Sequence, residues 1–508
     1  AMESWFKLLP FYSILSCFNI LLQSKYIPIW ILYYLVKLVL GYLLFKVEST
    51  LAINMFAIFA SATTKTFLTL SLLSVGLFNA GSEGLGYTFG LIFLTYSIAL
   101  YFRFLAYSVW IEAKITLFSK SCLFVLIAAI FGSPYLVLLL LPMFAYLAVE
   151  YRTMVKENSA VKTHYDTIFT NTVAKFLKTG VVTIVIVAFI ASFLYDNKYY
   201  PVINTIFFDI LMNVEKLLSQ KSEESTIIYY LSSLILSFSP VAVIGFLMTF
   251  MFIIPWHQLL CVWPLMFQIV MWLSMCFVIN FKSEMYLYPV YTHVNVIASF
   301  SLCYIYSILK TKLGDGAKII KFAKHIAVLV SASAFFTRIY ANYMNNSGTI
   351  TVFKDVYYLP QAKELKTLCV GDEYKTYPGS FFLPDNFRLG FVETDYKIDL
   401  PINFPELKDE QKITHWIDGI KIKTSKHSEY EEKIVDIDEC DYFVESNQSS
   451  SSLVNMKEVK CSLVIDAENS SLLAKYFAFP YSTTFFEKLG LQDHISPVYK
   501  DYCLYEQT

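Results

Sequence analysis

The side chains best suited to chemistry lie in a short polar loop between two long apolar runs. In Asn280-Phe-Lys-Ser-Glu-Met-Tyr-Leu-Tyr-Pro-Val-Tyr291, Lys282 could contact a phosphate, and Glu284 could act as an acid, a base or an orienting carboxylate. Ionisable groups near membrane depth are costly, so each is a candidate for a functional role. The alternative, which the periodicity alone favours, is an ordinary solvated loop.

A second polar loop follows another apolar run and reads Tyr195-Asp-Asn-Lys-Tyr-Tyr-Pro201. Asp196 could orient a sugar hydroxyl, and Tyr199 and Tyr200 could line its path. Alternatively, Asp196 caps a helix and the tyrosines belong to the aromatic belt at a membrane interface. Glu48 and Glu83 are isolated carboxylates for which we expect solvated or capping roles.

The composition is that of a membrane protein. Of 508 residues, 56% are hydrophobic and only 16% are charged, and the mean hydropathy is +0.52. The net charge of −1 gives no electrostatic footprint for nucleic acid. The nine cysteines have no zinc-like spacing, so no metal site is expected. Of these, Cys369, Cys440, Cys461 and Cys503 lie in a polar tail, where an oxidising lumen would permit one disulfide.

The elements that position the two loops are membrane-spanning helices, each of which needs about 20 apolar residues. We predict about nine to eleven spans in all. The apolar runs lie near 27–45, 61–78, 87–102, 121–149, 179–195, 227–251, 259–279, 286–309 and 326–343. Gly132-Ser133-Pro134 predicts a broken helix or a tight hairpin inside 121–149. Residues 5–22, which Pro10 interrupts, could instead lie in the interface.

Lysine and arginine indicate the orientation, because they collect on the cytosolic side. Lysines or arginines collect in residues 103–120, 150–178 and 310–324, which are therefore predicted to be cytosolic. The loops 79–86, 196–226 and 280–285 then face the lumen. We therefore predict a transmembrane domain over 1–345 and a soluble luminal domain over 346–508.

The tail is predicted to be a small α/β domain, with strand-like runs such as Ser462-Leu-Val-Ile465, Pro-rich turns and a mobile loop near 446–453. It holds glycosylation sequons at Asn447 and Asn469, and a third lies just before it at Asn345.

Several segments carry a resemblance to one enzyme family. In the tail they are Leu368-Cys-Val-Gly-Asp-Glu373, Tyr377-Pro-Gly-Ser-Phe-Phe-Leu-Pro-Asp-Asn-Phe-Arg-Leu-Gly-Phe391, Leu400-Pro-Ile-Asn-Phe404 and Tyr499-Lys-Asp-Tyr-Cys-Leu504. They resemble the luminal domain of the ER dolichyl-phosphate-mannose α-1,2-mannosyltransferases of glycosyltransferase family 22, which belong to the GT-C class. Residues 196–204 resemble that family's Asp-x-x-Tyr-Tyr…Pro-x-x-Asn loop. Residues 281–291 resemble its His-Lys-Glu-x-Arg-Phe-x-Phe-Pro-x-Tyr signature, and Tyr34-Leu-Val-Lys-Leu-Val-Leu-Gly41 resembles an early span.

The resemblance implies inverting transfer of mannose from dolichyl phosphate mannose to a dolichol-linked oligosaccharide in the ER membrane. The partners would be this polyprenyl-phosphate donor, the lipid-linked acceptor and membrane lipid, without a metal or another cofactor. The implied catalytic residues are Glu284, Lys282 and Asp196. The implied substrate-binding residues are Tyr199, Tyr200, Asn204 and Tyr291.

The chain also departs from the family pattern. Phe281, Ser283, Met285 and Tyr286 replace the His, first Glu, Arg and Phe of the signature. The family's acidic first loop has no counterpart, and we expect it to be missing through truncation or lost activity. Two alternatives therefore stay open: a mannosyltransferase of glycolipid-anchor precursor assembly, and a catalytically inactive membrane subunit of the same pathway.

Overall fold

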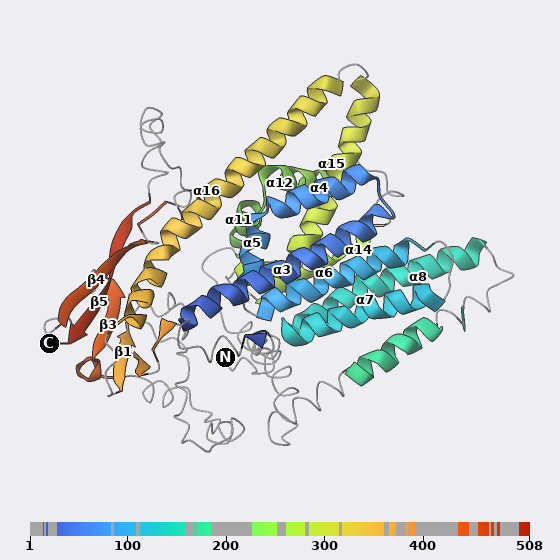
Figure 1. The fold of residues 1–508 in the computed structure, drawn as a ribbon. Coiled ribbons are helices and arrows are strands. Elements are labelled where there is room, and N and C mark those ends of the chain that lie inside the picture. The colour runs from blue at the N-terminus through green and yellow to red at the C-terminus, as the bar shows by residue number, and fades with distance from the viewer. Residues whose placement is uncertain are drawn as a thin grey trace. The chain divides into compact units, whose positions relative to one another are not determined.

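The structure is a computed structural model and is shown in Figure 1. It describes residues 14, 17–18, 28–82, 86–107, 112–157, 166–167, 170–183, 226–250, 261–279, 284–313, 317–359, 365–371, 382–384, 386–392, 435–446, 456–466, 469–471, 475–477 and 497–507. These residues form two compact units. The membrane unit is built from 35–335, and the tail unit from 336–508 with the beginning of the first long helix. The predicted boundary at 345 lies inside a continuous helix and stays a prediction.

Long apolar helices dominate the chain. They are α3 (Ile29–Phe56), α6 (Gly86–Leu105), α7 (Glu112–Phe131), α8 (Leu140–Glu157), α15 (Tyr288–Leu313) and α16 (Ala317–Tyr357). Six of the described helical segments are long and apolar enough to cross a membrane. The protein is therefore a polytopic helical membrane protein, as predicted. The total of nine to eleven spans stays a prediction, because 5–22 and much of 179–195 lie outside the described residues.

Several predicted spans are interrupted or have different ends. The run 61–78 is two helices, α4 (Ser61–Leu72) and α5 (Val75–Ser82), and 227–251 is also two, α11 (Thr226–Ser237) and α12 (Pro240–Phe250). The predicted break in 121–149 is confirmed, because α7 ends at Phe131 and the 3-10 turn η2 (Pro134–Leu139) leads into α8. The predicted span 259–279 is α14 (Trp263–Ile279), and α16 extends well beyond the predicted 326–343.

Local sequence explains the two unexpected breaks. The Ser239 hydroxyl accepts a hydrogen bond from the backbone N–H of Ala242 at 3.2 Å, and Pro240 is the first residue of α12. A serine cap followed by proline is a strong signal for a helix start. Ser74 caps α5 in the same way, through the N–H of Leu77 at 3.3 Å. These caps supply the hydrogen bonds that a break in an apolar environment would otherwise leave unmade.

The ends of α6 and α8 lie beside the start of α7. The Lys114 ammonium, on the first turn of α7, is 2.8 Å from the Glu150 carboxylate on α8. It also lies 4.8 Å from the centre of the Phe104 ring at the end of α6. Both partners of this ion pair are largely buried, with side-chain exposures of 3% and 15%. The predicted cytosolic segments 103–120 and 150–178 therefore meet at one end of the membrane unit.

Helices α6 and α15 run in the same direction. The hydroxyl of Thr95, halfway along α6, lies 2.9 Å from that of Thr292, near the beginning of α15. Further along, the Phe59 ring contacts both Phe102 and Phe300 at 5.6 and 5.4 Å. The end of α15, with Lys310 and Lys312 in its last turn, therefore lies at the same basic end as that of α6.

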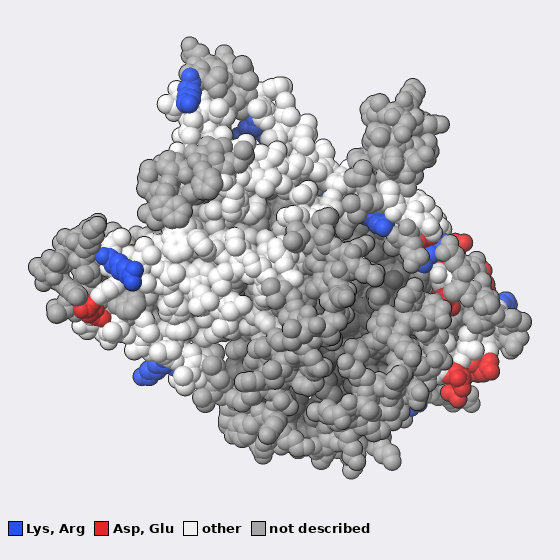
Figure 2. All heavy atoms as spheres, turned by 180° about the vertical axis from the view of Figure 1, so that it is seen from behind, with Lys and Arg blue, Asp and Glu red and all other residues white. Residues whose placement is uncertain are grey.

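Glu284 lies at the opposite end, in the 3-10 turn η4 (Glu284–Leu287) that precedes α15. This separation of basic residues from the candidate carboxylate is the one that the predicted orientation requires. On the face shown in Figure 2, few of the described side chains in the central area are charged, as expected for a lipid-facing surface.

Glu48 does not have the solvated or capping role that we expected. It lies inside α3, which continues to Phe56, and it is only 8% exposed. Its carboxylate lies beside the hydroxyl of Ser71 on α4. The prediction was wrong because we ended the span at residue 45, whereas the helix continues to Phe56, about three turns further.

The tail unit contains a five-stranded mixed sheet, which confirms the predicted α/β character. The strand order is β2-β1-β3-β5-β4. The strands are β1 (Lys366–Val370), β2 (Phe387–Phe391), β3 (Tyr442–Ser446), β4 (Met456–Ile465) and β5 (Tyr499–Gln507). β1 runs parallel to β2 and β3, whereas β5 is antiparallel to β3 and β4. The end of α16 lies along this sheet (Figure 1).

Side chains alternate between the two faces of the sheet, as they must along extended strands. One face packs against Val352, Phe353 and Val356 of α16, and its residues are Leu368, Val370, Tyr442, Val444, Tyr502 and Leu504. The other face forms a second cluster that includes Cys369, Cys440, Phe443, Cys503 and Tyr505.

The second face carries two disulfides, Cys369–Cys440 and Cys461–Cys503, where the sequence led us to allow one. The antiparallel register places Cys461 directly opposite Cys503. Cys440 lies just before β3, the strand that pairs with β1, and so comes close to Cys369.

Removing the longer-range disulfide should destabilise the tail. It joins residues 71 apart in the sequence, and a loop of that size corresponds to about 4 kcal/mol in the chain-entropy account. We expect the double variant Cys369→Ser/Cys440→Ser to lose heat tolerance, measured as protease resistance of the tail in detergent-solubilised protein. Cys303→Ala, which removes a thiol in the membrane unit, is the matched control. Equal resistance of the double variant and the control would contradict this pairing.

Candidate active site

Glu284 is held by two hydroxyl groups from other helices. The Ser237 hydroxyl donates to Glu284 Oε1 at 2.6 Å, and the Tyr291 hydroxyl donates to the same oxygen at 2.9 Å. The Tyr291 and Ser237 hydroxyl oxygens are 2.9 Å apart, so the three groups form a closed triangle. Hydrogen bonds to a charged acceptor are among the stronger ones, at about 1.5–3 kcal/mol each. The side chain of Glu284 therefore has a fixed position.

Three interruptions in helical structure meet at this triangle. Ser237 is the last residue of α11, just before the break that leads to α12. Glu284 lies in η4, and Tyr291 is in the first turn of α15. From the break between α4 and α5, the Ser74 hydroxyl donates to the Ser237 carbonyl at 3.4 Å. At membrane depth, a break in a helix is tolerated only where protein or water forms hydrogen bonds with the freed backbone N–H and C=O groups. Here a side chain at one break bonds to the backbone at another.

Gly76 allows α5 to approach this triangle closely. A Cβ at this position would lie 2.7 Å from the Ser237 Cβ and 2.7 Å from Tyr291 Cε2, and 3.0 Å from the Ser237 carbonyl oxygen. Such distances are shorter than real carbon contacts, so only glycine fits without displacing one of the two hydrogen-bond donors.

Aromatic side chains surround the triangle. Tyr291 is fully buried, and its ring packs edge-on against Phe238 with 5.1 Å between ring centres. Tyr229 of α11 lies close enough to interact electrostatically with the Glu284 carboxylate. The indole N–H of Trp272 on α14 donates to the Tyr286 carbonyl in η4 at 2.5 Å, and this bond helps to fix the position of η4.

The arrangement leaves Glu284 able to act on a proton. Both hydroxyl donors contact Oε1, and within the described part of the chain no hydrogen bond to Oε2 is found. Glu284 is partly exposed, whereas Ser237 and Tyr291 are buried. A partly exposed carboxylate that is held through one oxygen is suited to a base or an orienting group. Tyr291 positions Glu284 here, and its predicted contact with substrate stays a prediction.

The other predicted site residues lie outside the described residues. These are Lys282, Asp196, Tyr199, Tyr200 and Asn204. The sequence analysis also missed three residues of the site, namely Ser74, Gly76 and Ser237. The Ser239-Pro240 cap signal could have shown that a helix ends just after Ser237. No local signal pairs that helix end with a loop 47 residues away.

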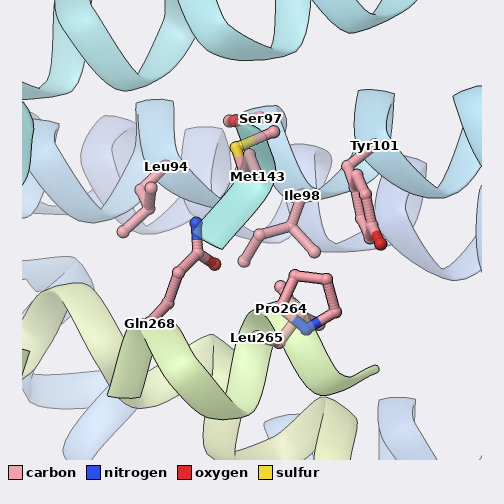
Figure 3. Close-up of a pocket in the computed structure, with 8 residues that line it drawn as sticks. All are labelled: Leu94, Ser97, Ile98, Tyr101, Met143, Pro264, Leu265 and Gln268. Atoms are coloured by element: carbon pink, nitrogen blue, oxygen red, sulfur yellow. The ribbon is translucent and has the colours of Figure 1, made fainter. Parts of the chain in front are cut away.

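A small cavity elsewhere in the membrane unit is too small to be a substrate-binding site. It lies between α6, α8 and α14, and it is lined by Leu94, Ser97, Ile98, Tyr101, Met143, Pro264, Leu265 and Gln268 (Figure 3). Its space is that of about one water molecule, which is too little for a sugar. Gln268 donates to the Leu139 carbonyl at 2.8 Å and lies 3.0 Å from His293 Nε2, so this amide has a structural role.

In the described part of the chain, one group of three candidate metal-ligand atoms lies close together, on Glu458, Cys461 and Cys503. The two cysteines are joined to each other, so neither offers a thiolate, and we assign no ion to this position.

The long apolar helices and the five-stranded sheet of the tail define a multi-pass helical membrane protein with a small α/β tail. The model of the Alg9-like mannosyltransferase family matches residues 1–384. The chain therefore belongs to the Alg9-like mannosyltransferase family, and it is a mannosyltransferase.

The relatives agree with this assignment. The chain is 25% identical to Alpha-1,2-mannosyltransferase ALG9 of Saccharomyces cerevisiae, over 100% of this chain and 88% of the yeast protein. It is 25% identical to the Mus musculus and 23% identical to the Homo sapiens protein of the same name, over 43% of this chain and 39% of each relative. No solved structure matches the chain significantly.

The close approach of α5 gives a direct test of the triangle. Gly76→Ala should displace Ser237 or Tyr291, at a cost of about 1–3 kcal/mol in packing, and should lower transferase activity several-fold or more. Gly41→Ala is the matched control, because a Cβ at Gly41 would have no neighbour within 4 Å. Activity is measured as mannose transfer in membranes with equal amounts of each variant. If both variants kept full activity, the triangle would not be needed for transfer.

Proposed function

We propose that this chain transfers mannose from dolichyl phosphate mannose to a dolichol-linked oligosaccharide in the ER membrane, forming an α-1,2 linkage. In the proposed step, the 2-hydroxyl oxygen of an acceptor mannose forms a bond to the anomeric carbon of the donor mannose. The bond from that carbon to the phosphate oxygen breaks on the opposite face, so the configuration inverts. Dolichyl phosphate leaves with the bonding electron pair, and Glu284 accepts the proton of the attacking hydroxyl.

The position of Glu284 is the observation that carries the proposal. It lies at the end of the membrane unit opposite the basic residues, where a lipid-anchored sugar can reach it while its isoprenoid chain stays in the bilayer. The Ser237 and Tyr291 hydroxyls both donate to Glu284 Oε1, so the carboxylate is held in one position at this end of the membrane unit.

Lys282 and Asp196 lie outside the described residues, and we include them in the proposed site because of the chemistry of their side chains. Lys282 is two residues before Glu284, and its ammonium would stabilise the departing phosphate. Asp196 would orient a sugar hydroxyl, and Tyr199, Tyr200 and Asn204 would line the path of the substrate. The reaction as proposed needs no metal or other cofactor.

The luminal placement of the tail is also part of the proposal. α16 is continuous from Ala317 to Tyr357 and includes a candidate span, which supports a topology with its basic beginning in the cytosol and the tail in the lumen. Two disulfides suit an oxidising compartment, since the cytosol keeps thiols reduced.

Glu284→Gln tests the proposed function. Gln keeps an oxygen that can accept from Ser237 and Tyr291, but its amide cannot take up a proton, so we expect transfer to fall about 10²–10⁴-fold. The assay is complementation of a yeast strain that lacks the corresponding mannosyltransferase, read as the mass of its lipid-linked oligosaccharides. Glu458→Gln, an exposed carboxylate of β4, is the matched control and should restore mannose fully.

The same assay separates the alternatives. If the unchanged chain restores no mannose although it reaches the ER membrane, the α-1,2 transfer to oligosaccharide is contradicted. Label on a glycolipid-anchor precursor would then select the anchor pathway, and label on neither product would select an inactive subunit. Full activity of Glu284→Gln would retain the reaction but remove Glu284 as its base.

A further inference from the structure

The three Asn-x-Ser sequons near and within the tail differ in what the structure allows them to carry. An asparagine-linked glycan is bulky and must point into solvent. Asn345 and Asn469 lie among the described residues, whereas Asn447 does not. The two described sequons differ in exposure, since Asn345 is buried and Asn469 is exposed.

Asn345 is unsuitable because it is built into a helix and buried. It lies within α16, and it is only 4% exposed. Its Nδ2, the atom that would carry the glycan, donates to the Lys475 carbonyl at 2.9 Å. On the same helix face, a Cβ at Gly348 would lie 2.1 Å from the Leu463 carbonyl oxygen. This face of α16 is therefore pressed against the tail, and a glycan would separate the two.

Asn469 has the opposite environment. It is exposed in a turn that follows β4, and its Nδ2 donates a hydrogen bond to Asp466 Oδ2 at 2.6 Å, the one bond of this nitrogen found among the described residues. An amide nitrogen has two hydrogens, so one can be replaced by a sugar while the other still bonds to Asp466.

The turn that presents Asn469 is anchored on its inner side. The buried Ser470 hydroxyl donates to the Val498 carbonyl at 3.2 Å and accepts from the Val498 N–H at 2.9 Å. Asp466 Oδ1 accepts from the Asn469 N–H at 3.2 Å. The turn is thus fixed by its middle residue, and the asparagine side chain remains outside.

We propose that Asn469 carries an asparagine-linked glycan and that Asn345 does not. In this modification, Asn469 Nδ2 forms a bond to the anomeric carbon of a glycan donated by a lipid diphosphate. The bond from that carbon to the diphosphate oxygen breaks, the lipid diphosphate leaves with the electron pair, and the amide loses one proton. The proposal rests on the luminal placement of the tail, and the glycan would be attached by the host's oligosaccharide-transferring enzyme.

The test uses the full chain expressed in yeast in an Asn447→Gln background, which removes the sequon outside the described residues. We expect one mobility shift on treatment with peptide N-glycosidase. The shift should be lost in Asn469→Gln and in Ser471→Ala, and kept in Asn345→Gln and in Ser471→Thr. Ser471→Ala removes the sequon without changing Asn469, so it separates loss of the glycan from loss of the hydrogen bond to Asp466.

A positive control separates this inference from the luminal placement. Lys457→Asn with Val459→Thr creates a sequon at exposed positions of the edge strand β4. If this sequon is glycosylated but Asn469 is not, the inference is overturned and the luminal placement stands. A shift that persists in Asn447→Gln/Asn469→Gln and disappears with Asn345→Gln also overturns it. If neither Asn469 nor the control sequon is modified, the tail is not luminal, and both proposals fail.

Discussion

A carboxylate inside an assembly of apolar helices must be hydrogen-bonded, and in this protein that requirement determines how several helices meet. Glu284 obtains its partners from Ser237 at the end of α11 and Tyr291 at the start of α15. These donors come together because the helices are interrupted there. The breaks cost helical hydrogen bonds, and the Ser239 and Ser74 caps recover some of them. The candidate site is thus where the fold departs from regular helix.

This arrangement makes small residues as important as polar ones. Gly76 allows α5 to touch Ser237 and Tyr291, and the Ser74 hydroxyl bonds to the Ser237 carbonyl across the same contact. A larger side chain at position 76 would displace Ser237 or Tyr291, the two residues that hold Glu284.

The tail is stabilised by different means. Its sheet has one face covered by α16 and the other reinforced by two disulfides, so a small domain gains stability beyond that of its apolar core. Three of the segments that carry the family resemblance coincide with β1, β2 and β5. The resemblance in the tail therefore follows the strands of this sheet, whereas the chemistry is assigned to the membrane unit.

The sequence by itself determined the class of protein, the basic end of the membrane unit and the break at Gly132–Pro134. These depend on composition and on neighbouring residues, which act locally. It also named Glu284 as a candidate, because residues 281–291 resemble the family signature, whereas the apolar pattern alone favoured an ordinary solvated loop. Only the tertiary structure decided that Ser237 and Tyr291 hold Glu284, that Gly76 must be small, that Glu48 is buried and that four cysteines form two pairs. Those features depend on contacts between segments that are distant in the sequence. The pattern of apolar residues within one helix or strand does not show which other helix or strand it will pack against.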